Sequence, residues 1–123
     1  MLLAKRVFIV AGVYGILVLT PFYFLEKKIG EDYPPINHPE YYYGFLGVAL
    51  AFQVLFLIVA RDPARYRPVM IPCVLEKVSF GVAAIVLYVR QLIPLPVFAG
   101  GMVDLVFAGL FIAAYLRCRD QAT

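Results

Sequence analysis

Residues 69–89 read VMIPCVLEKVSFGVAAIVLYV, and this stretch decides the fold class. Apart from Glu76, Lys77 and Ser79, its side chains are apolar or aromatic over the roughly 20 residues that a helix needs to cross a hydrocarbon core about 30 Å thick. The run has no two-residue alternation of the kind seen in membrane β-strands, and a helix satisfies its backbone groups within one segment. The stretch therefore predicts a transmembrane helix.

Three further stretches have the same character, at residues 7–25, 41–60 and 96–116. The first exceeds the roughly 7–15 apolar residues of a signal peptide, so we expect it to be retained as a helix. The connections are short and carry prolines or charges, such as RDPARYRP at residues 61–68, and short connections make consecutive helices antiparallel. The sequence predicts an all-α integral membrane protein, in which residues 1–123 form one four-helix transmembrane up-down-up-down bundle.

Composition supports a membrane habitat. The 123 residues are 63% hydrophobic and 15% charged, with a mean hydropathy of +0.87, whereas soluble domains have about 45–50% apolar and about 25% charged residues. A soluble domain of this size could not bury so much apolar surface in one core. Eleven basic against eight acidic residues leave a net charge of only +3, which excludes a free nucleic-acid binder. The expected partners are the lipid bilayer and other membrane subunits or further copies of the chain.

Basic residues predict the orientation, because they accumulate in cytoplasmic loops. Seven flank one side of the predicted spans and three flank the other: Lys5, Arg6, Arg61, Arg65, Arg67, Arg117 and Arg119 against Lys27, Lys28 and Arg90. We expect both termini to be cytoplasmic, in the inner or plasma membrane of a bacterium. Cys73 and Cys118 then fall on the reducing side, and they form no Cys-x-x-Cys pair.

The residues that lipid should exclude are the most informative. Gln53, Glu76, Lys77 and Asp104 lie inside the spans, where a charge near the bilayer centre costs at least about 2.5–3.5 kcal/mol. At about 1.5 Å rise per residue, all four lie within about 5 Å of the midplane, and Tyr14 has the same depth as Lys77. We expect these five residues to form an interior polar cluster. The specific hypothesis pairs Lys77 with Asp104 and has Glu76 accept hydrogen bonds from Gln53 or Tyr14.

Two interpretations of this cluster remain open. In the first, it is structural and holds the register and order of the helices. In the second, Glu76 and Asp104 are functional carboxylates that take up and release protons in a medium of low dielectric constant.

His38 lies outside the predicted spans, just before the second one. Because no span contains a histidine, a tetrapyrrole held by two histidines inside the bundle is excluded. A loop or capping histidine is one interpretation, and an axial ligand to a pigment or haem in a larger assembly is the other. No zinc-ligand spacing occurs, and the nearby carboxylates have an unspecific spacing for a metal site: Glu31, Asp32 and Glu40.

Two surface features bear on partners. Arg61, Arg65 and Arg67 form a basic cluster on the cytoplasmic side that would attract anionic lipid headgroups, besides acting as a topology signal. Small residues four apart predict close helix contacts, within the chain or between chains: Ala11 and Gly15, Gly47 and Ala51, and Gly109 and Ala113.

These observations favour a non-enzymatic function. The loops are too short to build a soluble active site, and the spans contain no Gly-x-Ser-x-Gly turn and no phosphate-binding loop. The leading hypothesis is an accessory or assembly subunit, or a subunit that holds a lipophilic ligand, in a larger membrane complex or a homo-oligomer. The alternative is a small proton-coupled transporter or channel that uses the intramembrane carboxylates. A lipid-modifying enzyme is the third and least supported hypothesis. The sequence does not indicate whether the chain binds a cofactor.

Overall fold

The computed structural model describes residues 2–24 and 38–121, and these residues form an all-helical structure. The elements are α1 (Leu2–Leu19), η1 (Thr20–Phe24), α3 (Pro39–Arg61), η2 (Arg67–Val69), α4 (Met70–Val89) and α5 (Leu95–Gln121). Four helical segments of 23 or 24 residues are long and apolar enough to cross a membrane. The prediction of four apolar helices is confirmed for the part of the chain that is described.

Prolines explain several helix boundaries. The first helix begins at Leu2, five residues before the predicted span, and gives way at Thr20 to a 3-10 helix. Pro21 has no N–H to continue the α-helical pattern, which accounts for this change. Pro39 occupies the first helical position of α3, where a missing N–H is tolerated. This helix ends at Arg61, because Pro63 disfavours the helical conformation at Asp62.

The end of α4 is closed by a Schellman motif. The Leu92 N–H donates to the Leu87 carbonyl at 2.8 Å, and the Gln91 N–H donates to the Tyr88 carbonyl at 2.9 Å. Gln91 adopts the left-handed conformation, with φ of 61°, that this motif needs and that glycine usually supplies. The chain therefore reverses sharply between α4 and α5.

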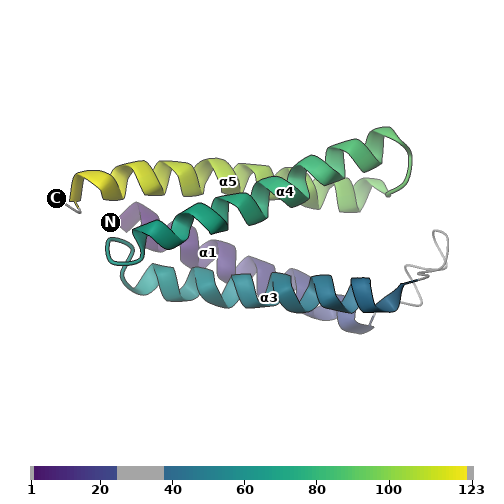
Figure 1. The fold of residues 1–123 in the computed structure, drawn as a ribbon, viewed down its shortest axis with the longest axis horizontal. Helices are drawn as coiled ribbons and strands as arrows, with labels where there is room; N and C mark the ends of the chain where they lie inside the picture. Colours follow the sequence, from purple (N-terminus) through teal and green to yellow (C-terminus); the bar gives the residue numbers. More distant parts are fainter. Residues whose placement is uncertain (1, 25–37, 122–123) are drawn as a thin grey trace.

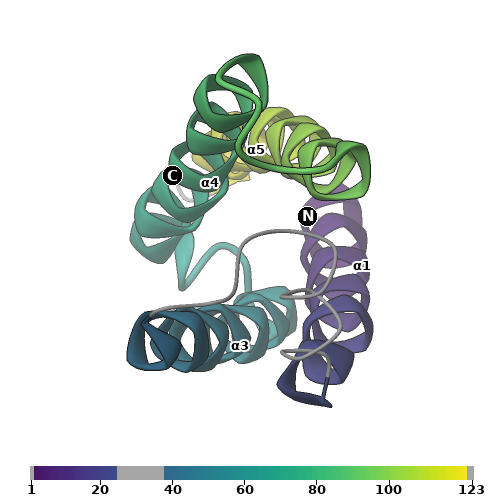
Figure 2. The same ribbon diagram turned by 90° about the vertical axis from the view of Figure 1, so that its right-hand side faces the viewer.

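The four helices surround a common interior (Figures 1 and 2). In Figure 1 both ends of the chain lie at the same end of the bundle, and Figure 2 shows α1 beside α3 and α4 beside α5. Helix α1 also packs on α5, whereas α3 and α4 have the fewest contacts of these neighbouring pairs. Between α3 and α4 the rings of Phe45 and Phe80 stack with centroids 5.6 Å apart.

Close approach within each pair depends on glycine. A Cβ at Gly15 of α1 would overlap the Gln53 side chain of α3. In the other pair, a Cβ at Gly81 of α4 would overlap Leu105 of α5. Small residues at such positions let helix backbones approach, which favours association in a medium without a hydrophobic driving force.

Three phenylalanines form the centre of the core. Phe8, Phe56 and Phe111 come from α1, α3 and α5, and each is fully buried. The Phe8 and Phe111 rings stack with centroids 4.3 Å apart, and Phe56 meets Phe111 edge to face at 5.0 Å. Both cysteines, Cys73 and Cys118, are free thiols buried in the same cluster. The outer surface carries many exposed leucine, valine and isoleucine side chains.

Candidate functional site: a buried charged triad

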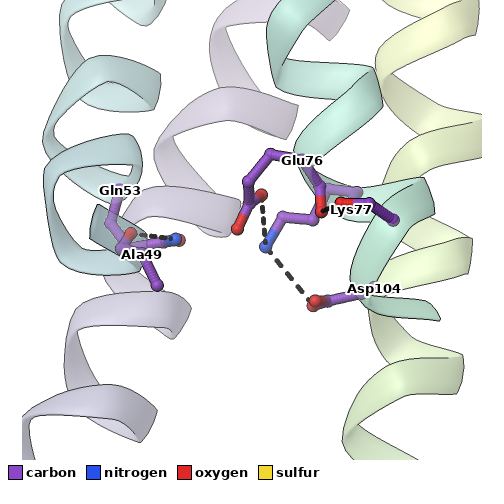
Figure 3. A network of polar contacts seen from close by, with 6 residues as sticks. Ala49, Gln53, Glu76, Lys77 and Asp104 are labelled. Atoms are coloured by element: carbon purple, nitrogen blue, oxygen red, sulfur yellow. Dashed lines mark hydrogen bonds and ion pairs between the residues drawn. The ribbon is translucent and has the colours of Figure 1, made fainter. Parts of the chain in front are cut away.

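The interior contains one lysine between two carboxylates. The Lys77 side chain is 3% exposed, and its Nζ lies 3.3 Å from Asp104 Oδ1 and 3.8 Å from Glu76 Oε2 (Figure 3). We call Glu76, Lys77 and Asp104 the charged triad. The hydrogen bond from Lys77 to Asp104 joins α4 to α5, and it is the pairing that the depth of the two residues predicted.

Aromatic rings complete the surroundings of the ammonium group. Lys77 Nζ lies 5.1 Å from the ring centroid of Phe56 and 5.6 Å from that of Phe107. At these distances the negative face of an aromatic ring attracts a cation. The ammonium is therefore stabilised by residues from α3, α4 and α5. Phe56 and Phe107 were not predicted as site residues, because phenylalanine in an apolar span carries no signal that separates such a role from ordinary packing.

The triad has an unbalanced formal charge. Two ionised carboxylates around one ammonium sum to −1, and Asp104 takes the shorter contact with the ammonium. Glu76 Oε2 is buried and has no hydrogen-bond partner among the described residues. The Glu76 side chain is only 16% exposed, so water can satisfy little of it. Glu76 is therefore the group of the triad with the weakest compensation.

The structure corrects the predicted partners of Glu76. The Gln53 Nε2 donates to the Ala49 carbonyl at 2.7 Å, one turn back on its own helix, instead of to Glu76. Figure 3 shows Gln53 across the interior from the triad. Tyr14 packs its ring against Phe107, with centroids 5.6 Å apart, and makes no hydrogen bond to Glu76 within the described residues. A backbone carbonyl four residues back is always within reach of a helical side chain, whereas a neighbouring helix need not be.

His38 lies on the surface at the start of α3. Its side chain is 66% exposed, and Nδ1 lies 3.0 Å from Glu40 Oε1. The ring also contacts Tyr41, with centroids 5.1 Å apart. Of the carboxylates near His38 in the sequence, Glu31 and Asp32 lie outside the described residues. Among the described side chains of residues 2–24 and 38–118, no three histidine, cysteine or acidic side chains are grouped as metal ligands.

The three arginines of the predicted headgroup cluster have different surroundings. Arg61 and Arg65 are exposed, and the Arg65 guanidinium lies 5.7 Å from the Tyr66 ring centroid. Arg67 is partly buried: its Nε donates to the Tyr115 carbonyl at 2.9 Å, and its Cζ lies 3.7 Å above the Tyr115 ring. The three arginines lie close together in the sequence, but of these three only Arg67 is held against α5, by its contacts with Tyr115.

The arrangement supports charge compensation more directly than catalysis. Ser79 Oγ, the hydroxyl nearest in sequence to the triad, donates to the backbone carbonyl of Glu76 at 3.3 Å.

Comparison of the chain with protein-family models, with curated proteins and with solved structures finds no match.

Proposed function

We propose that the chain is a non-enzymatic subunit of a membrane assembly, serving in assembly or in holding a lipophilic ligand. The assembly is either a larger complex or a homo-oligomer. In this proposal the four helices cross the inner or plasma membrane of a bacterium in an up-down-up-down order, and both termini are cytoplasmic. The charged triad then has a structural role, because the Lys77–Asp104 ion pair joins α4 to α5 and the Lys77 ammonium contacts the Phe56 ring of α3.

One observation carries this proposal: small residues on α3 and α5 face outward, and two of them, Gly44 and Gly109, have no neighbour among the described residues. A Cβ built at Gly44 or at Gly109 would meet no described atom within 4 Å, and Ala51 is exposed on α3. Transmembrane helices use such positions to approach another helix closely, whereas contact with lipid needs no small residue. Gly15, by contrast, is already used inside the bundle. The outward positions therefore suit contact with a helix from another subunit or another copy.

Native mass measurement in a mild detergent tests the proposal. The expected result is a complex with a partner, a ligand or further copies. This complex should be lost in Gly44→Leu or Gly109→Leu and retained in the control Val82→Leu, which enlarges an exposed position of α4. A wild-type chain that runs only as a lone monomer without ligand would contradict the subunit role.

The orientation has its own test. Reporter domains fused after residue 123 and into the 61–66 connection should both be active on the cytoplasmic side. A reporter inserted at Gln91 should be active on the opposite side. Activity of all three reporters on one side would reject the four crossings.

The weakly compensated carboxylate of Glu76 favours a second candidate function, a small proton-coupled transporter or channel that works as an oligomer. Glu76 Oε2 lacks a hydrogen-bond partner in the described interior, so this oxygen has a free lone pair for a proton or a small cation. Proteoliposomes should then show pH-dependent flux that Glu76→Gln abolishes. Full flux in Glu76→Gln, or no flux for any tested ion or amphiphile, would count against this function.

A further inference from the structure

An apolar groove lies on the outer surface between α4 and α5. Its volume is about 200 Å³, and it is lined by Met70, Ile71, Val74, Leu75, Ile112 and Tyr115. Five of these side chains are aliphatic, and three of them, Ile71, Leu75 and Ile112, are exposed on the outside of the helix pair. The groove follows the first two turns of α4, which run from the 61–69 connection toward the middle of the bundle. Its shape and chemistry suit a hydrocarbon chain.

A cation is fixed at one end of this groove. Arg67 precedes α4, and its guanidinium lies over the ring of Tyr115, which also lines the groove. Only Nε of the guanidinium is bonded, to the Tyr115 carbonyl. Among the side chains that the structure describes, those of residues 2–24 and 38–118, no carboxylate forms an ion pair with Arg67 and no acceptor bonds its two terminal nitrogens. These nitrogens remain available to an external anion.

The distance between the cation and the groove matches a lipid. Arg67 and Leu75 are eight residues apart, or about 12 Å at about 1.5 Å per residue, within the half-thickness of about 15 Å of a hydrocarbon core. A guanidinium presents paired N–H donors that match two phosphate oxygens. The exposed Arg61 and Arg65 add positive charge at the same end of the bundle, which favours an anionic headgroup over a zwitterionic one.

We propose that the α4–α5 groove binds one anionic phospholipid, with its phosphate on Arg67 and an acyl chain along Val74 and Ile112. The inference rests on the proposed membrane insertion, and it is independent of the proposed subunit role. Native mass measurement separates the two: a lone monomer that keeps a lipid adduct would reject the subunit role and leave the lipid site intact.

The test measures retention of added dioleoyl phosphatidylglycerol by the full chain in detergent, by native mass spectrometry. Arg67→Gln should weaken binding roughly tenfold, since a hydrogen bond to a charged group is lost. Arg67→Lys should bind the lipid more tightly than Arg67→Gln and less tightly than the wild type. Lysine keeps the positive charge but lacks the paired N–H donors of a guanidinium. Val74→Phe should weaken binding by filling the groove while Arg67 stays in place. Circular dichroism verifies that each variant keeps its helix content.

Matched controls make the outcome decisive. Arg61→Gln removes an equal charge from an exposed position and should change binding about twofold or less, because exposed charges are screened. Val82→Phe enlarges an exposed side chain of α4 outside the groove and should have no effect. Equal retention of phosphatidylcholine, equal competition by glycerol phosphate without acyl chains, or equal losses in Arg61→Gln and Arg67→Gln would each overturn the proposal.

Discussion

Replacing Lys77 with methionine tests the charge balance of the interior. The substitution removes the only cation of the charged triad and leaves Glu76 and Asp104 without a counter-charge in a site where Lys77 itself is 3% exposed. Removing one partner of a buried ion pair costs about 3–5 kcal/mol, because the remaining charge is buried and uncompensated. The two ring contacts of the ammonium, with Phe56 and Phe107, are lost as well. We expect Lys77→Met to lower the free energy of unfolding by at least about 3 kcal/mol.

The two carboxylate variants provide the matched comparison. Glu76→Gln leaves the hydrogen-bonded Lys77–Asp104 pair, whose formal charge is zero, and should change stability by about 1 kcal/mol or less. Asp104→Asn leaves Lys77 with Glu76 at 3.8 Å and should have an intermediate effect, since the shorter contact is lost. In the combination of Lys77→Met with both carboxylate substitutions no charge remains, and most of the lost stability should return.

Unfolding in a titration with sodium dodecyl sulfate, followed by circular dichroism, gives these free energies. A double-mutant cycle between Lys77→Met and Asp104→Asn isolates the coupling of the pair. The reasoning is refuted if Glu76→Gln destabilises the protein as much as Lys77→Met, or if the losses of Lys77→Met and Asp104→Asn are additive.

Three further predictions concern a helix contact, the end of α4 and the two buried thiols. Gly15→Ala should destabilise the bundle by about 1–3 kcal/mol because its Cβ would displace a buried glutamine, whereas Gly44→Ala at an open position should cost nothing, as the same detergent titration would measure. Gln91→Gly should stabilise by about 1 kcal/mol by removing left-handed strain, and unchanged stability would argue against the Schellman motif. Cys73 and Cys118 should resist a maleimide until the protein is unfolded; rapid labelling of the folded protein would contradict their burial.

Depth along the helices predicted part of the site. The Lys77–Asp104 pair was accessible to sequence reasoning because a buried ammonium needs a carboxylate, and few candidates share its predicted depth. The number of apolar helices was equally accessible, since each span is a long uninterrupted run. Both predictions depend on the high free-energy penalty for unpaired polar groups in lipid.

The depth of a residue along its helix did not predict the direction in which its side chain points around the helix axis. Gln53 has the right level for the cluster, but it lies across the interior from the triad, where it bonds to Ala49 and packs on Gly15. The fixed position of Arg67 on Tyr115 joins residues 48 apart in the chain, and spacing gives no sign of it. Such contacts depend on how the helices rotate about their axes, which apolar spans specify weakly.

Solid-state NMR of the protein in lipid bilayers tests most directly whether the charged side chains of the apolar helices meet each other inside the bundle. The measurement is the through-space correlation between ¹⁵N-labelled Lys77 Nζ and the ¹³C-labelled Asp104 carboxyl carbon. The account predicts a cross-peak that is present in the wild type and absent in Asp104→Asn. A Lys77 Nζ that correlates with lipid and shows no carboxylate cross-peak would contradict it.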